Sequence, residues 1–244
     1  MCSSDLQIRE RLELDGELAQ ALDSEQLRLM IQPQVHKSGT LIGGEVLLRW
    51  TNRRGISIPP SQFIPLAEQS GLIVPISQWT LHQLLERLKI WAESALPLPR
   101  LALNISPRQL ELPSRHFVGA LLDSLQAFSL LPEQLELEIT ESVLMRNPLV
   151  AREQLNALAD QGFRIAIDDF GTGYSSLELL RSLPVHRLKI DHAFVASIVD
   201  SPEDQAIVQA TITLARGLGM ECIAEGVETS EQRRFLEQLG CDLY

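Results

Sequence analysis

The sequence has few cysteines, few aromatic residues and no long apolar run. Its 244 residues include three cysteines and only 5% Phe, Trp and Tyr. Three scattered thiols (Cys2, Cys222 and Cys241) do not make a disulfide framework or a zinc knuckle, which favours a reducing compartment. No apolar run approaches the ~20 residues of a membrane-spanning helix, and the polar first ten residues lack a signal-peptide core. We therefore expect a cytoplasmic location, either as a free protein or as the cytoplasmic part of a membrane-bound parent.

Basic residues are also scarce. Asp and Glu outnumber Lys and Arg by 32 to 21, which gives a formal net charge of −11. Such a chain does not bind a nucleic-acid polymer through general electrostatic attraction. A phosphorylated ligand would need a local reversal of the field. The 45% hydrophobic content is typical of a globular protein, and the length fits one large domain.

Short apolar runs alternate with longer amphipathic ones, which predicts a mainly parallel sheet with crossover helices. Seven runs are predicted strands: 27–35, 41–50, 100–105, 134–139, 164–168, 187–190 and 220–224. The predicted helices are 76–91, 115–128, 149–160, 175–181, 203–218 and 230–239. A Ser38-Gly39 turn predicts that the first two strands form a hairpin.

This pattern favours an α/β (βα)8 TIM-like barrel over an open doubly wound sheet, because no Gly-rich dinucleotide fingerprint follows the first strand. Residues 240–244 are predicted to begin an eighth strand that is truncated in this chain, since seven strands would leave two unpaired edges. Residues 1–22 are expected to be a linker or helix from an upstream region, and residues 23–244 to be the barrel domain.

Polar side chains lie at or near the ends of six predicted strands, where barrel enzymes carry their chemistry. They are Glu45, Asn104, Glu138, Asp168, Asp169, Lys189, Asp191 and Glu225. Crowded acids repel one another, and divalent cations would remove that repulsion. Carboxylates with one amide suit Mg²⁺, Mn²⁺ or Ca²⁺ rather than Zn²⁺. Two such ions ~3.5–4 Å apart are the usual apparatus for displacement at phosphorus.

Other features near these acids have both structural and functional interpretations. Lys189 is the only one of three lysines at a strand end; it could pair with the acids, or it could orient the catalytic water and stabilise charge on a phosphate. The segment 171–176 (GTGYSS) could be a plain turn or a loop that covers the metal site, with Ser175 capping the next helix. Arg49 and Gln32 could be surface polar groups, or they could contact a ligand's phosphate or base edges.

Eight segments together resemble a known family. They are QPQV (32–35), GGEVLLRW (43–50), FIPLAEQSGLI (63–73), LNISPRQL (103–110), LELEITES (135–142), DDFGTGYSSL (168–177), LKID (188–191) and AEGVET (224–229). They are similar to the EAL-domain phosphodiesterases of cyclic di-GMP signalling, over about residues 18–244. The signature tripeptide of the family is Glu-Ala-Leu, and this sequence has Glu45-Val46-Leu47 in its place. Because side chains alternate across a strand, we expect Val46 to face the helix layer and to change packing but not activity.

The resemblance implies a (βα)8 barrel whose first strand is antiparallel to the others. It implies hydrolysis of one phosphodiester of cyclic di-GMP to linear pGpG, with two Mg²⁺ or Mn²⁺ ions per site and with Ca²⁺ as an inhibitor. The implied roles are metal ligands Glu45, Asn104, Glu138, Asp168 and Asp169; a catalytic lysine, Lys189; a general base or second-metal ligand, Glu225; substrate contacts Gln32, Arg49 and Asp191; and loop-positioning acids Glu141 and Glu228.

The resemblance also implies partners and alternatives. A homodimer through the barrel and an upstream sensory or diguanylate-cyclase-like domain are expected, and a nucleic-acid polymer is not. In the family, a glutamine of the eighth strand helps to hold the metal-site water, and no residue before Tyr244 supplies it. One alternative is therefore a receptor that binds cyclic di-GMP without cleaving it. Another is a metal-dependent barrel hydrolase for other phosphodiesters. The complete set of acids through Glu225 favours the phosphodiesterase.

Overall fold

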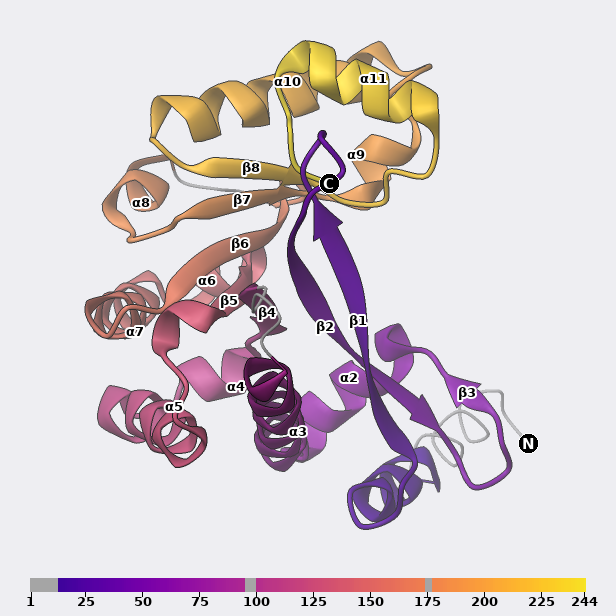
Figure 1. The fold of residues 1–244 in the computed structure, drawn as a ribbon, viewed down its shortest axis with the longest axis vertical. Helices are drawn as coiled ribbons and strands as arrows, with labels where there is room; N and C mark the ends of the chain where they lie inside the picture. The colour runs from indigo at the N-terminus through magenta and orange to yellow at the C-terminus, as the bar shows by residue number, and fades with distance from the viewer. Residues whose placement is uncertain (1–12, 95–99, 174–176) are drawn as a thin grey trace.

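The computed structural model describes residues 13–94, 100–173 and 177–244. A curled sheet forms the middle of the molecule, and helices cover its outer face (Figure 1). A helix at 13–21 comes first. The strands that follow are β1 (Leu27–Val35), β2 (Leu41–Thr51), β3 (Ser57–Ile58), β4 (Arg100–Asn104), β5 (Leu135–Thr140), β6 (Arg164–Phe170), β7 (Arg187–Ile190) and β8 (Glu221–Ala224).

The helices alternate with the strands from β4 onward. They are α2 (Pro60–Ser70), α3 (Ile73–Glu93), α4 (Pro107–Leu110), α5 (Ser114–Phe128), η1 (Pro132–Gln134), α6 (Glu141–Arg146), α7 (Pro148–Asp160), α8 (Leu177–Ser182), α9 (His192–Ala196), α10 (Pro202–Gly217) and α11 (Ser230–Leu239). Four of the α-helices (α2, α4, α7 and α10) begin on a proline, whose fixed φ suits the first helical position. Within the described ranges, no helix is long and apolar enough to cross a membrane.

The sheet runs in the order β1-β2-β4-β5-β6-β7-β8, with β3 paired to β2. β1 is antiparallel to β2, and every later pair on this path is parallel. The predicted TIM-like barrel with an antiparallel first strand is thus confirmed. β3, α4, α6 and α9 were not predicted, because they are too short to show a clear hydrophobic period. α2 was not predicted either; it contains Pro65, a residue type that usually interrupts a helix.

Residues 241–244 lie between the two edges of the sheet. Leu243 bridges His36 near the end of β1 and Ile223 of β8. The backbones of Val35 and Tyr244 exchange two hydrogen bonds of 2.8 and 3.0 Å. This is the place of an eighth barrel strand, and it is the segment in which the sequence predicts one.

The two faces of the strands differ in chemistry. On β5, Leu135, Leu137 and Ile139 pack outward against the helices in the main hydrophobic core, whereas Glu136 and Glu138 point into the barrel. β7 repeats this arrangement, with Leu188 in the same core and its charged residues inside. The interior of this barrel is therefore filled by charged groups that must find partners there, because an unpaired buried charge is costly.

The helix at 13–21 packs onto the barrel. Leu18 and Ala21 are buried in a second apolar cluster with Leu27, Trp50 and Phe63. The rings of Trp50 and Phe63 meet edge to face at 5.7 Å. The domain boundary after residue 22 stays a prediction.

Val46 of the Glu-Val-Leu tripeptide is 4% exposed and packs in the main core with Leu84 and Leu88 of α3. Replacing Val46 by alanine deletes two buried methyl groups. We expect the free energy of unfolding to fall by about 1–2 kcal/mol. We also expect the distances around Glu45 to be kept, because Val46 faces away from it. Urea denaturation of Val46→Ala measures the loss of stability, and Mn²⁺ titration measures whether the cation site is kept. A loss of Mn²⁺ binding free energy as large as the loss of stability would contradict the second expectation.

Candidate active site

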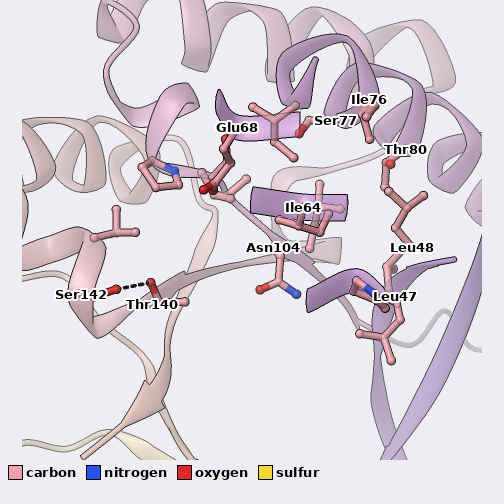
Figure 2. Close-up of a pocket in the computed structure, with 18 of the residues that line it drawn as sticks. Leu47, Leu48, Ile64, Glu68, Ile76, Ser77, Thr80, Asn104, Thr140 and Ser142 are labelled. Carbon is pink, nitrogen blue, oxygen red and sulfur yellow. Dashed lines mark hydrogen bonds between the residues drawn. The ribbon is translucent and has the colours of Figure 1, made fainter. Parts of the chain in front are cut away.

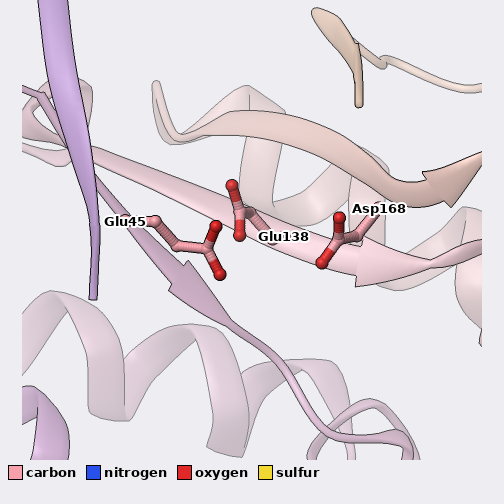
Figure 3. A group of neighbouring side chains, drawn as sticks. All are labelled: Glu45, Glu138 and Asp168. Carbon is pink, nitrogen blue, oxygen red and sulfur yellow. The ribbon is translucent and has the colours of Figure 1, made fainter. Parts of the chain in front are cut away.

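Carboxylates from neighbouring strands gather at the carboxyl end of the barrel. Glu45 of β2, Glu138 of β5 and Asp168 of β6 point toward one another (Figure 3), with one oxygen of each within 4.8 Å of the others. Asp168, Asp169 and Glu225 form a second group by the same measure. Asp168 belongs to both groups, so the two candidate cation positions lie side by side.

Lys189 of β7 lies at the centre of these acids. Its Nζ is 3.0 Å from Glu45 Oε2, 2.8 Å from Glu138 Oε2, 3.0 Å from Asp168 Oδ1 and 2.6 Å from Glu225 Oε1. The side chain is 1% exposed. Burial alone would lower the pKa of Lys189, but the four carboxylates outweigh burial and hold it well above its ordinary value. Lys189 is therefore a fixed positive charge and not a proton acceptor at neutral pH.

The acids titrate unusually as well. Burial raises the pKa of Glu138 well above its ordinary value. Burial, followed among the raising effects by the charge of Asp168, raises the pKa of Glu225 to about 7. The same two causes raise the pKa of Asp169 to about 6. A cation that binds here must displace protons, so its affinity will increase with pH.

These shifts predict how pH affects the stability of the metal-free protein. Asp169 and Glu225 hold protons more tightly in the folded than in the unfolded chain, so the stability they contribute is present at low pH. It is lost as pH rises through their folded pKa values of about 6 and about 7. We therefore expect Tm in EDTA to fall between about pH 5 and pH 8 relative to that of a D169N/E225Q variant.

The variant is the necessary reference for that measurement. The pKa of His186 is lowered by burial and by Arg164 and Arg100, so His186 contributes the opposite sign in part of the same range. Differential scanning fluorimetry of both proteins isolates the contribution of the two acids. A constant difference in Tm across the range would contradict the assignment.

The donor set fits hard divalent cations. Glu138 Oε1 is buried and has no hydrogen-bond partner among the described residues. Asn104 donates from Nδ2 to Glu45 Oε1 at 3.0 Å, which brings its amide to the same cluster. Carboxylate and amide oxygens without thiolate or imidazole suit Mg²⁺ or Mn²⁺. Glu45, Asn104, Glu138 and Asp168 could hold one ion, and Asp168, Asp169 and Glu225 a second.

A break in the β6–β7 ladder lets two consecutive aspartates serve one site. Neighbouring residues of a regular strand point to opposite faces. Here the register shifts between Ile167 and Phe170, and Asp169 has a φ of 53°. A non-glycine residue in this left-handed region costs roughly 1–2 kcal/mol. The bulge turns Asp169 toward the acids instead of the helix layer.

The loop after β6 is held by Glu141 at the start of α6. The Gly171 N–H donates to Glu141 Oε2 at 3.0 Å. A Cβ on Gly173 would lie 2.9 Å from Glu141 Oε1, so glycine permits this close approach. Residues 174–176 lie outside the described residues, and the expected Ser175 cap lies with them. The exposed Glu228 makes no side-chain hydrogen bond to the described part of the loop.

The three expected substrate contacts lie in different environments. Gln32 pairs with Glu45 in the β1–β2 register and is exposed. Arg49 is half-buried and donates to the Leu48 carbonyl at 2.9 Å. Asp191 is buried at the start of α9, where it accepts from the Ala193 N–H at 2.7 Å, and it is close enough to contribute to the raised pKa of Asp169. The structure thus places Asp191 near Asp169, next to the acid cluster.

A cavity of about 330 Å³ adjoins the acids, between β2 and the helices α2, α3, α4 and α6. Asn104 and Arg49 belong to its wall, and its apolar lining includes Leu47 and Ile64 (Figure 2). The sequence patterns did not indicate the other polar residues of the lining, which include Glu68, Ser77, Thr80, Thr140, Ser142 and Arg146. They fall inside or beside the quoted motifs, but a helical period does not show which helix face lines a cavity.

The fold and the acidic strand ends define a TIM-like barrel with a candidate divalent-cation centre. The chain belongs to the EAL domain family, whose sequence model matches residues 15–244. The resemblance inferred from the motifs is therefore confirmed.

Two similar proteins are named as cyclic di-GMP phosphodiesterases. The chain is 42% identical over 238 residues to the bifunctional diguanylate cyclase/cyclic di-GMP phosphodiesterase MucR of Pseudomonas aeruginosa, covering 96% of this chain and 34% of that protein. It is 36% identical over 231 residues to the cyclic di-GMP phosphodiesterase PdeR of Escherichia coli, covering 95% and 34%. The chain spans about a third of the length of these relatives.

Solved structures show the same fold. The PaMucR phosphodiesterase in complex with c-di-GMP has a TM-score of 0.90 and 41% identity, and the match covers 95% of this chain and 93% of that one. The FimX EAL domain from Pseudomonas aeruginosa, bound to c-di-GMP, has a TM-score of 0.84 and 27% identity over 94% and 92% of the two chains.

Proposed function

We propose that this chain is a cyclic di-GMP phosphodiesterase that produces linear pGpG with the help of two divalent cations. The observation that carries the proposal is the pair of carboxylate groups that share Asp168 around a buried, protonated Lys189. Relatives named as cyclic di-GMP phosphodiesterases support the substrate.

Each group has a chemical task in this proposal. Bound Mg²⁺ or Mn²⁺ would activate water and neutralise charge at phosphorus. Lys189, which stays positive, stabilises the negative charge that develops on the phosphate oxygens. Glu225, with a pKa of about 7, is matched to accepting a proton near neutral pH. Glu141 holds the loop after Asp169 in place, and we assign the same task to Glu228.

We assign the substrate contacts to three residues around the site. The guanidinium of Arg49 can donate two hydrogen bonds to a phosphate or to a guanine edge in the adjoining cavity. Gln32, beside Glu45 in the register, and Asp191, near Asp169, complete the proposed contacts. Ca²⁺ prefers longer bonds and more ligands than Mg²⁺, so we propose that it binds the acids and inhibits.

A second candidate function is a receptor that binds cyclic di-GMP without cleavage. One observation favours it: Lys189 already forms ion pairs with four of the acids. A protein that uses this lysine as a permanent counter-ion would need no metal to keep the site folded.

One experiment separates these functions. The protein is incubated with cyclic di-GMP and Mn²⁺, with EDTA and Ca²⁺ as parallel conditions, and products are separated by chromatography. Formation of pGpG with Mn²⁺, but not with EDTA or Ca²⁺, supports the phosphodiesterase. Binding by calorimetry without product supports the receptor. Absence of both would point to another phosphodiester substrate.

We also propose three properties of the parent protein: a homodimer formed through the barrel, an upstream sensory or diguanylate-cyclase-like domain, and a cytoplasmic site of action. The support for the second is that the matched relatives are about three times as long as the matched region. Light scattering coupled to size-exclusion chromatography tests the first.

A further inference from the structure

A second ion-pair cluster lies inside the barrel, one layer below the acids. On β5 and β7 the inward-facing charges alternate, so Glu136 lies below Glu138 and Arg187 lies below Lys189. Arg187 Nη1 is 2.6 Å from Glu136 Oε1, and these side chains are 5% and 1% exposed. Both are therefore almost fully removed from water.

Arg187 contacts three other strands. Besides Glu136 of β5, its Nη2 lies 2.7 Å from Glu221 Oε2 of β8, and its Nη1 lies 3.3 Å from Gln34 Oε1 of β1. The intervening strand β6 presents the small, fully buried Ala166, which pairs in register with Arg187. A larger residue there would occupy the space between β7 and β5, so the small side chain leaves room for the guanidinium.

Glu136 is the carboxylate of the lower layer that Arg187 neutralises. Glu136 Oε2 is buried and has no hydrogen-bond partner among the described residues, so the cation in direct contact with Glu136 is Arg187, and Arg100 acts on it only through a longer-range charge interaction. If Arg187 lost its charge, Glu136 would become an uncompensated carboxylate in the barrel interior, which is strongly unfavourable. Lys189, two residues along β7 from Arg187, is the cation of the next layer that could turn toward it.

We infer that Arg187 is a positioning residue: by neutralising Glu136 it keeps Lys189 among the carboxylates of the upper layer. The inference uses the proposed function only in treating those carboxylates as the cation site. Mn²⁺ affinity, which needs no substrate, reports on it directly. It therefore succeeds or fails independently of cyclic di-GMP hydrolysis.

The test compares three variants by Mn²⁺ titration calorimetry, with thermal melts to verify folding. In Arg187→Met the unpaired Glu136 draws Lys189 downward, away from the upper carboxylates, which then attract Mn²⁺ more strongly. The Kd for Mn²⁺ therefore falls by at least about tenfold, and kcat also falls by at least about tenfold while KM changes little. In R187M/E136Q both charges are gone, and the Kd returns to within about threefold of the starting protein. Arg187→Lys keeps a cation beside Glu136, and its Kd also stays within about threefold.

A merely structural role gives a different pattern. If Arg187 acts only by bridging strands, all three variants lose the bridge and distort the site, so each binds Mn²⁺ more weakly than the starting protein, which overturns the inference. A folded Arg187→Met with unchanged Kd overturns it too. If Arg187→Met does not fold, the other two variants decide by the same criterion. Arg164→Met is the matched control, because Arg164 also contacts Glu221 (3.4 Å) but is 28% exposed; its Kd is expected to be unchanged.

Discussion

Replacing Asp168 by alanine is expected to abolish Mn²⁺-dependent formation of pGpG, with a loss of more than about 10³-fold in turnover. Asp168 is the one residue common to both carboxylate groups, so its removal weakens both candidate cation positions. Glu45 belongs to a single group, and Glu45→Ala is expected to have a large but smaller effect. Product chromatography under saturating substrate measures both losses.

The control for this experiment is an acid outside the site. Glu153 on the exposed face of α7 has the same charge and lies on a helix behind the sheet. Glu153→Ala should keep its turnover. Unchanged turnover in a folded Asp168→Ala protein would contradict the assignment of the site, whatever the product.

Replacing Lys189 by methionine is expected to have two measurable effects. The first is loss of turnover by about 10²-fold or more, because the charge that stabilises the phosphate is gone. The second is instability without metal. Four carboxylates within 2.6–3.0 Å of Nζ lose the cation that they share, and removal of one partner from a buried ion pair costs about 3–5 kcal/mol.

Added Mn²⁺ supplies positive charge to the same carboxylates. The increase in Tm on adding Mn²⁺ should therefore be larger for Lys189→Met than for the unmodified protein. Lys89→Met on the exposed face of α3 is the matched control and should behave as the unmodified protein does. If Mn²⁺ raises the Tm of Lys189→Met no more than it raises the Tm of the unmodified protein, Lys189 is not the counter-ion of this cluster. Fluorimetry with and without Mn²⁺ provides these values.

The fold could be predicted from the sequence because its strands alternate cleanly. On β5 the pattern LELEIT alternates apolar with polar residues, and the acids near the end of β6 and directly after β8 mark the end of the barrel that carries them. What the sequence could not show is the spatial arrangement of these charges. A strand pattern sends Asp168 and Asp169 to opposite faces, and only the bulge with its positive φ at Asp169 brings them together.

Other parts of the site depend on tertiary contacts as well. The sequence left two interpretations of Lys189 open, and its position amid four carboxylates comes from four different strands or strand ends. Arg187 showed no signal, because a charged residue within a short strand gives no indication that it is buried. The cavity beside Asn104 is assembled from strands β2, β4 and β5 and helices α2, α3, α4 and α6, and no local pattern predicts which of their faces meet.

The bridging of both sheet edges by residues 241–244 bears on the order of folding. The β1–β2 hairpin is local and can form early, whereas the Lys37–Asp242 ion pair joins residues 205 positions apart. Closing so long a loop costs entropy that is recovered only once the intervening strands are in place. Backbone amides of Val35 and Tyr244 should therefore be among the last to gain protection from hydrogen exchange during refolding. We therefore expect the pairing of β1 with residues 241–244 to be the slow step of folding.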